Sequence, residues 1–125
     1  MITNVTEKST ENVCNISYLS EIVGGKKAMI KGILDAFLIQ VANDLPAIND
    51  AIVKTDYGAI KKIAHAMKSS VSIMGMSVIK PVLEEMETLG ASATNVERIK
   101  VLNQDLQLIV SRAIIEIEKE KLHYV

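Results

Sequence analysis

Apolar residues recur at steps of three and four along most of this chain, the spacing typical of amphipathic helices. The longest run begins near Lys26 and places seven large apolar residues on one side: Ile30, Leu34, Phe37, Val41, Leu45, Ile48 and Ile52. Pro46 lies inside this run, where it removes a backbone donor and clashes with the preceding turn. The pattern therefore predicts one long helix that is kinked at Pro46 but continues beyond it.

Two further helices are predicted after this long one. Asp56 is placed to cap a helix that ends at Gly75, and Ser77 is placed to cap a shorter one that ends at Gly90. Their apolar faces consist of Ile60, Ala64, Met67, Val71 and Met74 in the first helix, and of Ile79, Val82, Leu83, Met86 and Leu89 in the second.

The last helix and a short N-terminal helix complete the pattern. Thr94 and Glu97 have the spacing of a capping box, which predicts the start of a helix that extends into the charged region at residues 116–121. Its inward positions are Ile99, Leu102, Leu106, Ile109 and Ala113. Near the other end of the chain, Ser17 is placed to cap a short helix that Gly24 and Gly25 terminate.

Four long amphipathic segments joined by short loops predict an all-α fold, an antiparallel up-down four-helix bundle with the short N-terminal helix capping one end. We expect one domain over residues 16–125, preceded by a flexible polar leader at residues 1–15. With 49% hydrophobic residues but a single phenylalanine and no tryptophan, the core must be aliphatic and rich in methionine.

Charge and cysteine content narrow the possible partners. A formal net charge of -1 provides no polycationic surface for nucleic acid, so any electrostatic function must be local. Cys14 is the only cysteine, which excludes an internal disulfide and fits a cytoplasmic location. Charged residues interrupt every apolar run well before the roughly 18 residues that would cross a bilayer, so we expect no membrane contact.

One histidine lies outside the apolar seam of the helix predicted to end at Gly75. At about 100° per residue, the seam residues fall within roughly 40° of one line, whereas His65 lies about 140° from Ile60 and faces solvent. Its neighbours on the same side of the wheel are two lysines and two serines: Lys61, Lys68, Ser69 and Ser72.

An exposed imidazole among lysines has the chemistry of a phosphoryl acceptor. The lysines attract an anion, a neutral histidine attacks phosphorus, and Lys68 balances charge on the phosphoryl oxygens while Ser69 and Ser72 donate hydrogen bonds. The chain has no glycine-rich phosphate loop, no HExxH, CxxC or GxSxG motif and no magnesium ligand set. If the anion is a phosphoryl group, we therefore expect a phosphoryl carrier that accepts and gives the group but has no kinase activity of its own.

The residues around this histidine resemble those of the histidine phosphotransfer (HPt) domains of multistep two-component phosphorelays. The segment AHAMKSS at residues 64–70, followed by Gly75, is similar to the family pattern A-H-x-L-K-G-S with a glycine ten residues after the histidine. The similarity continues in ISYL at 16–19, in Phe37 with Pro46 and in METLG at 86–90. It covers residues 16–118, which is most of the chain.

The resemblance implies that the phospho-aspartate of a receiver domain phosphorylates His65 on Nε2, and that His65 passes the group to another receiver. The partners would be receiver domains of response regulators or of a hybrid histidine kinase, with Mg²⁺ on the receiver and no cofactor or metal on this chain.

Lys68 matches the family's phosphate-side lysine. Glu87 matches a polar position near the histidine, where it would accept from Nδ1 or pair with Lys68; a solvated surface glutamate is the alternative. We expect a monomer.

Ser69 departs from the family pattern, because the family has glycine there. The added hydroxymethyl group would weaken or retune receiver docking, or donate to a phosphoryl oxygen, while His65 and Lys68 stay in place. This departure keeps open a non-catalytic helical adaptor that binds a receiver or kinase without phosphotransfer. An unrelated helical enzyme or scaffold would need a pocket of convergent polar groups, which the apolar inward faces do not offer.

Overall fold

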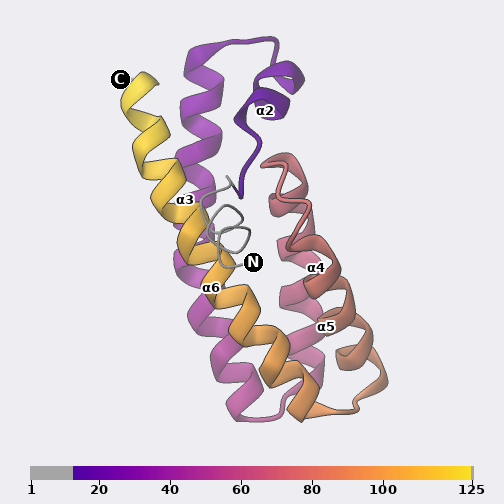
Figure 1. The fold of residues 1–125 in the computed structure, drawn as a ribbon. Helices are drawn as coiled ribbons and strands as arrows, with labels where there is room; N and C mark the ends of the chain where they lie inside the picture. The colour runs from indigo at the N-terminus through magenta and orange to yellow at the C-terminus, as the bar shows by residue number, and fades with distance from the viewer. Residues whose placement is uncertain (1–12, 125) are drawn as a thin grey trace, which may run out of the picture.

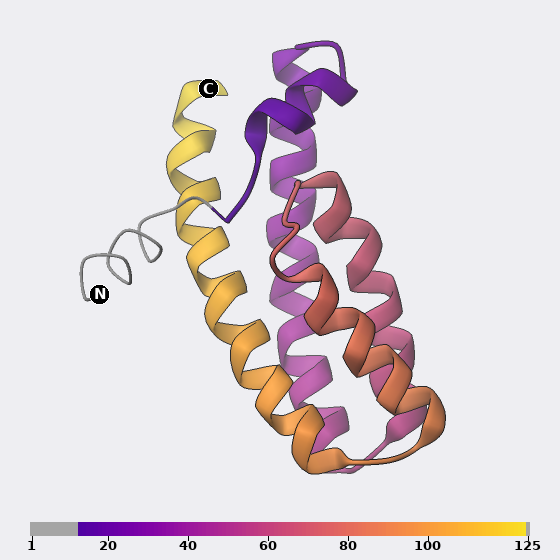
Figure 2. The same ribbon diagram turned by 45° about the vertical axis from the view of Figure 1, so that its right-hand side comes forward.

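The computed structural model describes residues 13–124 and consists of helices. They are α2 (Ile16–Ile22), α3 (Lys27–Val53), α4 (Tyr57–Ile73), α5 (Lys80–Ser92), α6 (Val96–Lys121) and the 3₁₀ helix η1 (Leu122–Tyr124). Helices α3 to α6 run alternately up and down, and α2 lies at one end of the bundle (Figures 1 and 2). The predicted antiparallel four-helix bundle with a short N-terminal helix is confirmed. None of the described helices is long and apolar enough to cross a membrane.

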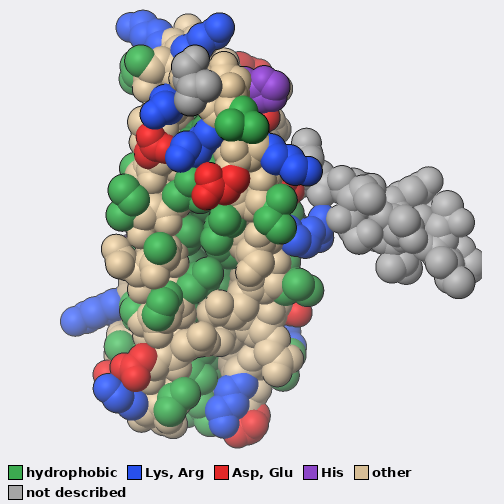
Figure 3. Space-filling view, turned by 90° about the vertical axis from the view of Figure 1, so that its left-hand side faces the viewer, with side chains coloured by type: hydrophobic (Ala, Val, Ile, Leu, Met, Phe, Trp, Pro, Cys, Tyr) green, Lys and Arg blue, Asp and Glu red, His purple; other side chains and the backbone are tan. Residues whose placement is uncertain are grey.

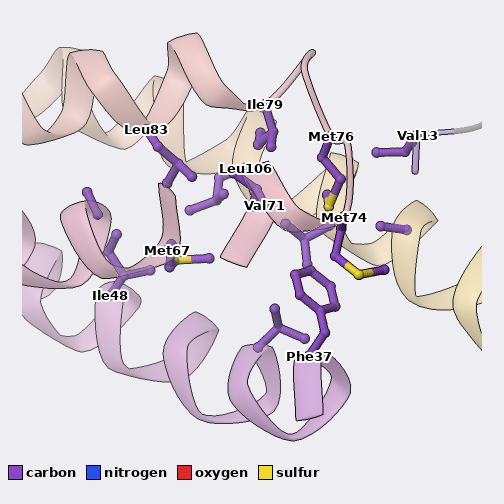
Figure 4. Close-up of a cluster of buried hydrophobic side chains, with 14 of the residues drawn as sticks. Val13, Phe37, Ile48, Met67, Val71, Met74, Met76, Ile79, Leu83 and Leu106 are labelled. Carbon is purple, nitrogen blue, oxygen red and sulfur yellow. The ribbon is translucent and has the colours of Figure 1, made fainter. Parts of the chain in front are cut away.

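The core is aliphatic and rich in methionine, as the composition predicts. Met67, Met74 and Met76 point inward between the helices, with Phe37 next to Met74 (Figure 4). All five residues of the predicted α4 seam are buried: Ile60, Ala64, Met67, Val71 and Met74. Unbranched methionines fill the irregular gaps that a core with little aromatic content leaves.

Helix α3 begins where predicted, after Lys26, and continues past Pro46 to Val53. Six of its seven predicted inward residues are buried, and Leu45 is partly buried against the core. Helix α3 packs against α4, α6 and η1. This packing accounts for a helix that continues through a proline, because the tertiary contacts outweigh one lost backbone hydrogen bond.

Two predicted N-terminal caps are displaced by one or two residues. Asn15, not Ser17, caps α2, and Asn95, not Thr94, caps α6; each asparagine side chain accepts a backbone N–H three residues further on. Asn95 has φ of 59°, a left-handed conformation that asparagine tolerates better than most residues. The predicted capping box is therefore wrong, and Glu97 instead forms an ion pair with Lys100. The third predicted cap, Asp56 at the start of α4, is confirmed.

Both predicted ends of α5 are also wrong. Ile79 occupies its N-cap position without a side-chain hydrogen bond, so Ser77 is not the cap, and the helix continues through Gly90 to Ser92. At Gly90 an added Cβ would lie 2.9 Å from the Lys61 backbone nitrogen and 3.0 Å from the Tyr57 carbonyl oxygen. Gly90 is thus a contact residue, where the backbones of α4 and α5 meet, rather than a helix stop.

The end of the polar leader packs on the bundle. Most of the leader predicted over residues 1–15 lies outside the described residues, but Val13 and Cys14 are buried. Their backbone N–H groups both donate to the Glu116 carboxylate of α6, at 2.5 and 2.9 Å. Burial, and secondarily the Glu116 charge, raises the pKa of the Cys14 thiol to about 12. The thiol is therefore protonated at neutral pH.

Gly75 lies where this N-terminal segment crosses the end of α4. The Asn15 N–H donates to the Met74 carbonyl at 3.0 Å. Gly75 has φ of +66°, and an added Cβ would lie only 2.6 Å from the Asn15 Cβ. Both its conformation and the close approach of Asn15 therefore favour glycine at this position.

Candidate functional site

The imidazole of His65 lies on the outer side of α4. Its side chain is 70% exposed, whereas its neighbour Ala64 is fully buried. Lys61, Ser69 and Ser72 are also exposed on this helix. The division between a buried seam and an exposed side follows directly from 100° of rotation per residue.

A glutamate from the next helix bridges the histidine and a lysine. Glu87 of α5 places Oε2 2.7 Å from His65 Nδ1 and Oε1 2.7 Å from Lys68 Nζ. The side chains of Glu87 and Lys68 are only 20% and 26% exposed. The alternative of a solvated surface glutamate therefore does not hold. We call His65, Lys68 and Glu87 the triad.

Close packing of α4 against α5 brings the triad together. The backbones approach closely at Gly90, one turn from Glu87 on α5, and at Lys61, one turn from His65 on α4. The antiparallel directions of the two helices then set Glu87 level with His65 and Lys68. A larger residue at position 90 would push the two helices apart and separate the carboxylate from its partners.

The charges within the triad determine which groups donate. The hydrogen bond from Lys68, and next the one with His65, lowers the pKa of the Glu87 carboxyl, and the Glu87 carboxylate raises the pKa of Lys68. The lowered pKa of Glu87 and the raised pKa of Lys68 both favour the charged forms of the two groups. Their attraction stabilises the fold above the ordinary carboxyl pKa and is lost as the pH falls through the lowered pKa of Glu87.

At neutral pH, Glu87 is therefore an acceptor only, so His65 Nδ1 must carry the hydrogen in their 2.7 Å contact. In a neutral imidazole with the proton on Nδ1, the other nitrogen, Nε2, has a free lone pair. Since the ring is 70% exposed, this nitrogen is available to a reactant from solvent. The arrangement supports nucleophilic attack by Nε2 and stabilisation of a cationic ring through Nδ1–H.

The remaining predicted residues contribute differently. Lys61, Ser69 and Ser72 lie on the exposed side of α4 as His65 does, and their roles stay predictions. Gly75 follows the end of α4, ten residues from His65 or nearly three turns away, where it meets Asn15 rather than the imidazole.

Sequence analysis missed a polar contact and an apolar hollow between α3 and α4. Ser70 Oγ donates to Gln40 Oε1 at 2.9 Å across these helices. Beside this bond is a hollow of about 180 Å³, lined by Ile33, Ala36, Phe37, Gln40, Ser70, Ile73 and Met74. The chain alone shows Gln40 and Ser70 as ordinary polar positions, because nothing local indicates that they face each other.

Comparison with known proteins agrees with this geometry. The model of the Hpt domain family matches residues 32–112, well over half of the chain, and this span contains the whole triad. Histidine-containing phosphotransfer protein B (HptB) from Pseudomonas aeruginosa PAO1, known from its crystal structure, has the same fold with a TM-score of 0.82. The two chains are 18% identical, and the match covers 90% of this chain and 97% of that one. No curated protein matches. The chain belongs to the Hpt domain family.

Proposed function

We propose that this protein is a phosphorelay intermediate that accepts a phosphoryl group on Nε2 of His65 from the phospho-aspartate of one receiver domain and passes it to another. The observation that carries the proposal is the Glu87 carboxylate 2.7 Å from His65 Nδ1, which directs the lone pair of the ring to its exposed nitrogen. Family membership supports phosphotransfer in general, and the triad supports this particular atom as the acceptor.

In the proposed transfer, the Nε2 lone pair attacks phosphorus and the bond between phosphorus and the aspartyl oxygen breaks. The electron pair of that bond stays on the receiver as a carboxylate, and His65 becomes a phosphorylated imidazolium. The Glu87 carboxylate stabilises the new positive charge through Nδ1–H. Transfer to a second receiver is the same displacement in reverse.

Lys68 has two partners in this proposal. One of its three donors is held by Glu87 Oε1 at 2.7 Å, which leaves two for the phosphoryl oxygens. Lys61 adds positive charge, and the hydroxyl groups of Ser69 and Ser72 supply donors on the same side of the helix. Mg²⁺ bound by the receiver would offset the remaining negative charge.

Exposed apolar residues on α3 and α4 favour a protein partner over a small substrate. Ile39 of α3 and Ile73 of α4 are exposed large apolar residues on the two helices that enclose the α3–α4 hollow. An exposed histidine on a domain that also exposes large apolar residues suits contact with the face of a folded domain, which would exclude water from the transfer. Receiver domains of response regulators or of a hybrid histidine kinase are the partners that we propose.

The first experiment follows radiolabelled phosphate from a phosphorylated receiver and Mg²⁺ onto this chain. We expect label that is stable in alkali and labile in acid, as a phosphoramidate is, and that moves to a second receiver when one is added. If a set of receivers binds the chain but never labels it, the adaptor without transfer is the correct function. If none binds or labels it, the relay assignment fails.

Substitution of Glu87 by glutamine tests the triad directly. The amide is neutral and can turn either its NH₂ donor or its carbonyl acceptor towards Nδ1, so it no longer fixes the proton on Nδ1 and it stabilises the imidazolium less than a carboxylate does. We expect transfer to slow on the order of 10- to 100-fold. Nitrogen NMR of His65 should show a loss of the preference for the Nδ1–H tautomer.

The matched control is Glu85→Gln on the same helix. Glu85 pairs with Arg98 of α6 at 2.7 Å instead of with His65, so this variant should transfer at the normal rate. An unchanged His65 tautomer in Glu87→Gln, or equal slowing in both variants, would contradict the role given to Glu87.

A further inference from the structure

Four branched apolar side chains form an exposed row along the last helix. Val101, Leu108 and Ile115 on α6 and Leu122, which directly follows it, are between 47% and 71% exposed. Successive members are seven residues apart, so all four fall within about 60° on a helical wheel. We call these four residues the α6 stripe. Exposed aliphatic residues scattered singly are common, but a row of four on one helix is not.

The α6 stripe lies opposite the buried side of its own helix. On the wheel its four residues are centred about 180° from Leu106, which is fully buried. α6 packs against α3 and α5, so Val101, Leu108 and Leu122 face away from the bundle. Ile115 borders a hollow that is also lined by the segment at residues 13–16. Figure 3 shows hydrophobic side chains along the middle of the face that includes α3 and α6, with charged groups mainly towards its two ends.

The seven-residue spacing favours another helix as the occupant. A row with one member every seven residues, at the same position of each heptad, stays in contact with a second helix when the two wrap around each other. The exposed apolar residues of α3 give a contrast, because Met29, Ile39 and Val53 are 10 and 14 residues apart and do not form a row of adjacent heptads. The α6 stripe is thus distinct from the general background of exposed apolar groups.

We propose that a second copy of this chain packs on the α6 stripe in antiparallel orientation. Such a pair has a two-fold axis near Ser111, which sets Val101 against Leu122 of the second copy and Leu108 against its Ile115. On one edge of the stripe, the same axis brings Asp105 of each copy beside Lys119 of the other, which gives two pairs of opposite charge. This charge complementarity is what selects a second copy as the partner.

A parallel arrangement lacks this match. It would set the edge with Asp105 against the other edge of the second helix, which carries Gln107 and Lys121. On that edge Gln107 donates to the Leu45 carbonyl of α3, and Lys121 forms an ion pair with Asp35 of α3. The antiparallel pair uses the other edge of α6, which carries Asp105 and Lys119, and leaves the contacts with α3 intact. Lys119 on this edge borders the hollow that the segment at residues 13–16 also lines.

The size of the stripe implies a weak, reversible dimer. Twenty-one residues of helix span about 32 Å, and a single row of side chains along that length covers less than the total of about 1,200 Å² typical of stable interfaces. Arg112, which makes an interaction of its own, approaches the two-fold axis from both copies and limits the affinity further. We therefore expect dissociation in the high-micromolar range.

This proposal differs from the monomer expected from the sequence and does not depend on phosphotransfer. Because α4 lies across the bundle from α6, both His65 side chains of the dimer face outward, and each copy could engage its own receiver.

Sedimentation equilibrium of the full chain from about 10 µM to 1 mM tests the dimer. We expect the mass to rise from that of one chain towards twice that value. Leu108→Glu should raise the dissociation constant at least 10-fold without unfolding the helices, because Leu108 is 64% exposed. Val53→Glu, which adds the same charge at an 81% exposed site on α3, should leave the dissociation constant unchanged.

A charge exchange tests the orientation. Asp105→Lys alone should weaken the dimer, and Asp105→Lys with Lys119→Asp should restore it. A mass that stays at one chain up to 1 mM, or no effect of Leu108→Glu, would overturn the interface. Failure of the double exchange to restore association would overturn the antiparallel pairing.

Discussion

Replacement of His65 by glutamine should abolish acceptance of the phosphoryl group. The amide nitrogen of glutamine has no available lone pair for attack on phosphorus, whereas Nε2 of an imidazole held by Glu87 does. No other group of the triad replaces it, because Lys68 is held in its charged form by Glu87 and a charged ammonium has no lone pair. We expect label on the variant to fall to background with every receiver that labels the normal chain.

The same chain offers a control for this loss. His123 is exposed in η1, at the end of the fold beyond α6, so His123→Gln should accept label normally. Circular dichroism of His65→Gln should match that of the normal protein, because the imidazole is 70% exposed and contributes little to the core. Persistence of alkali-stable label on His65→Gln would place the acceptor elsewhere and refute the site.

Replacement of Met67 by aspartate should unfold the protein. Met67 is 1% exposed and lies in the core between α3, α4 and α5 (Figure 4). The change removes apolar contacts and introduces a carboxylate with no cation or donor arranged to receive it. The expected loss of about 3–5 kcal/mol is comparable to the 5–15 kcal/mol that typically holds a domain folded.

Urea unfolding followed by circular dichroism measures this loss, with Met67→Leu as the control. Leucine keeps the side chain apolar and nearly the same volume, so it should cost less than about 1.5 kcal/mol. Met67 and His65 are two residues apart, yet one substitution should remove stability and the other only activity. A stable Met67→Asp protein would show that the seam of α4 is not packed as described.

The sequence predicted the helices well because their signal is repeated. Each apolar position of α3 or α6 adds to the same period, so single exceptions such as Pro46 or the partly buried Leu45 do not obscure it. The helix ends depend on one or two residues each. Asn95 and Thr94 are both good caps, and the choice between them rests on the path of the loop, which the local sequence does not determine.

Gly90 illustrates the same limit inside a helix. A glycine after a run of apolar residues is a common helix end, and the sequence pattern treats it so. Whether a glycine instead receives the backbone of another helix depends on how two segments about 30 residues apart meet. Here the backbones of Tyr57 and Lys61 occupy the place that a Cβ at position 90 would take. Gly90 therefore serves the contact between the two helices, and α5 continues beyond it to Ser92.

By itself, the sequence determined that His65 faces solvent between lysines and serines and that the residues behind it form the core. A helix turns by a constant angle per residue, so the direction of each side chain around the helix axis follows from its residue number. The partner of His65 was decided only by the tertiary structure. Which residue of α5 lies beside His65 depends on the register and distance of two separate helices, and the close packing at Gly90 sets both, bringing Glu87 to Nδ1 and to Lys68.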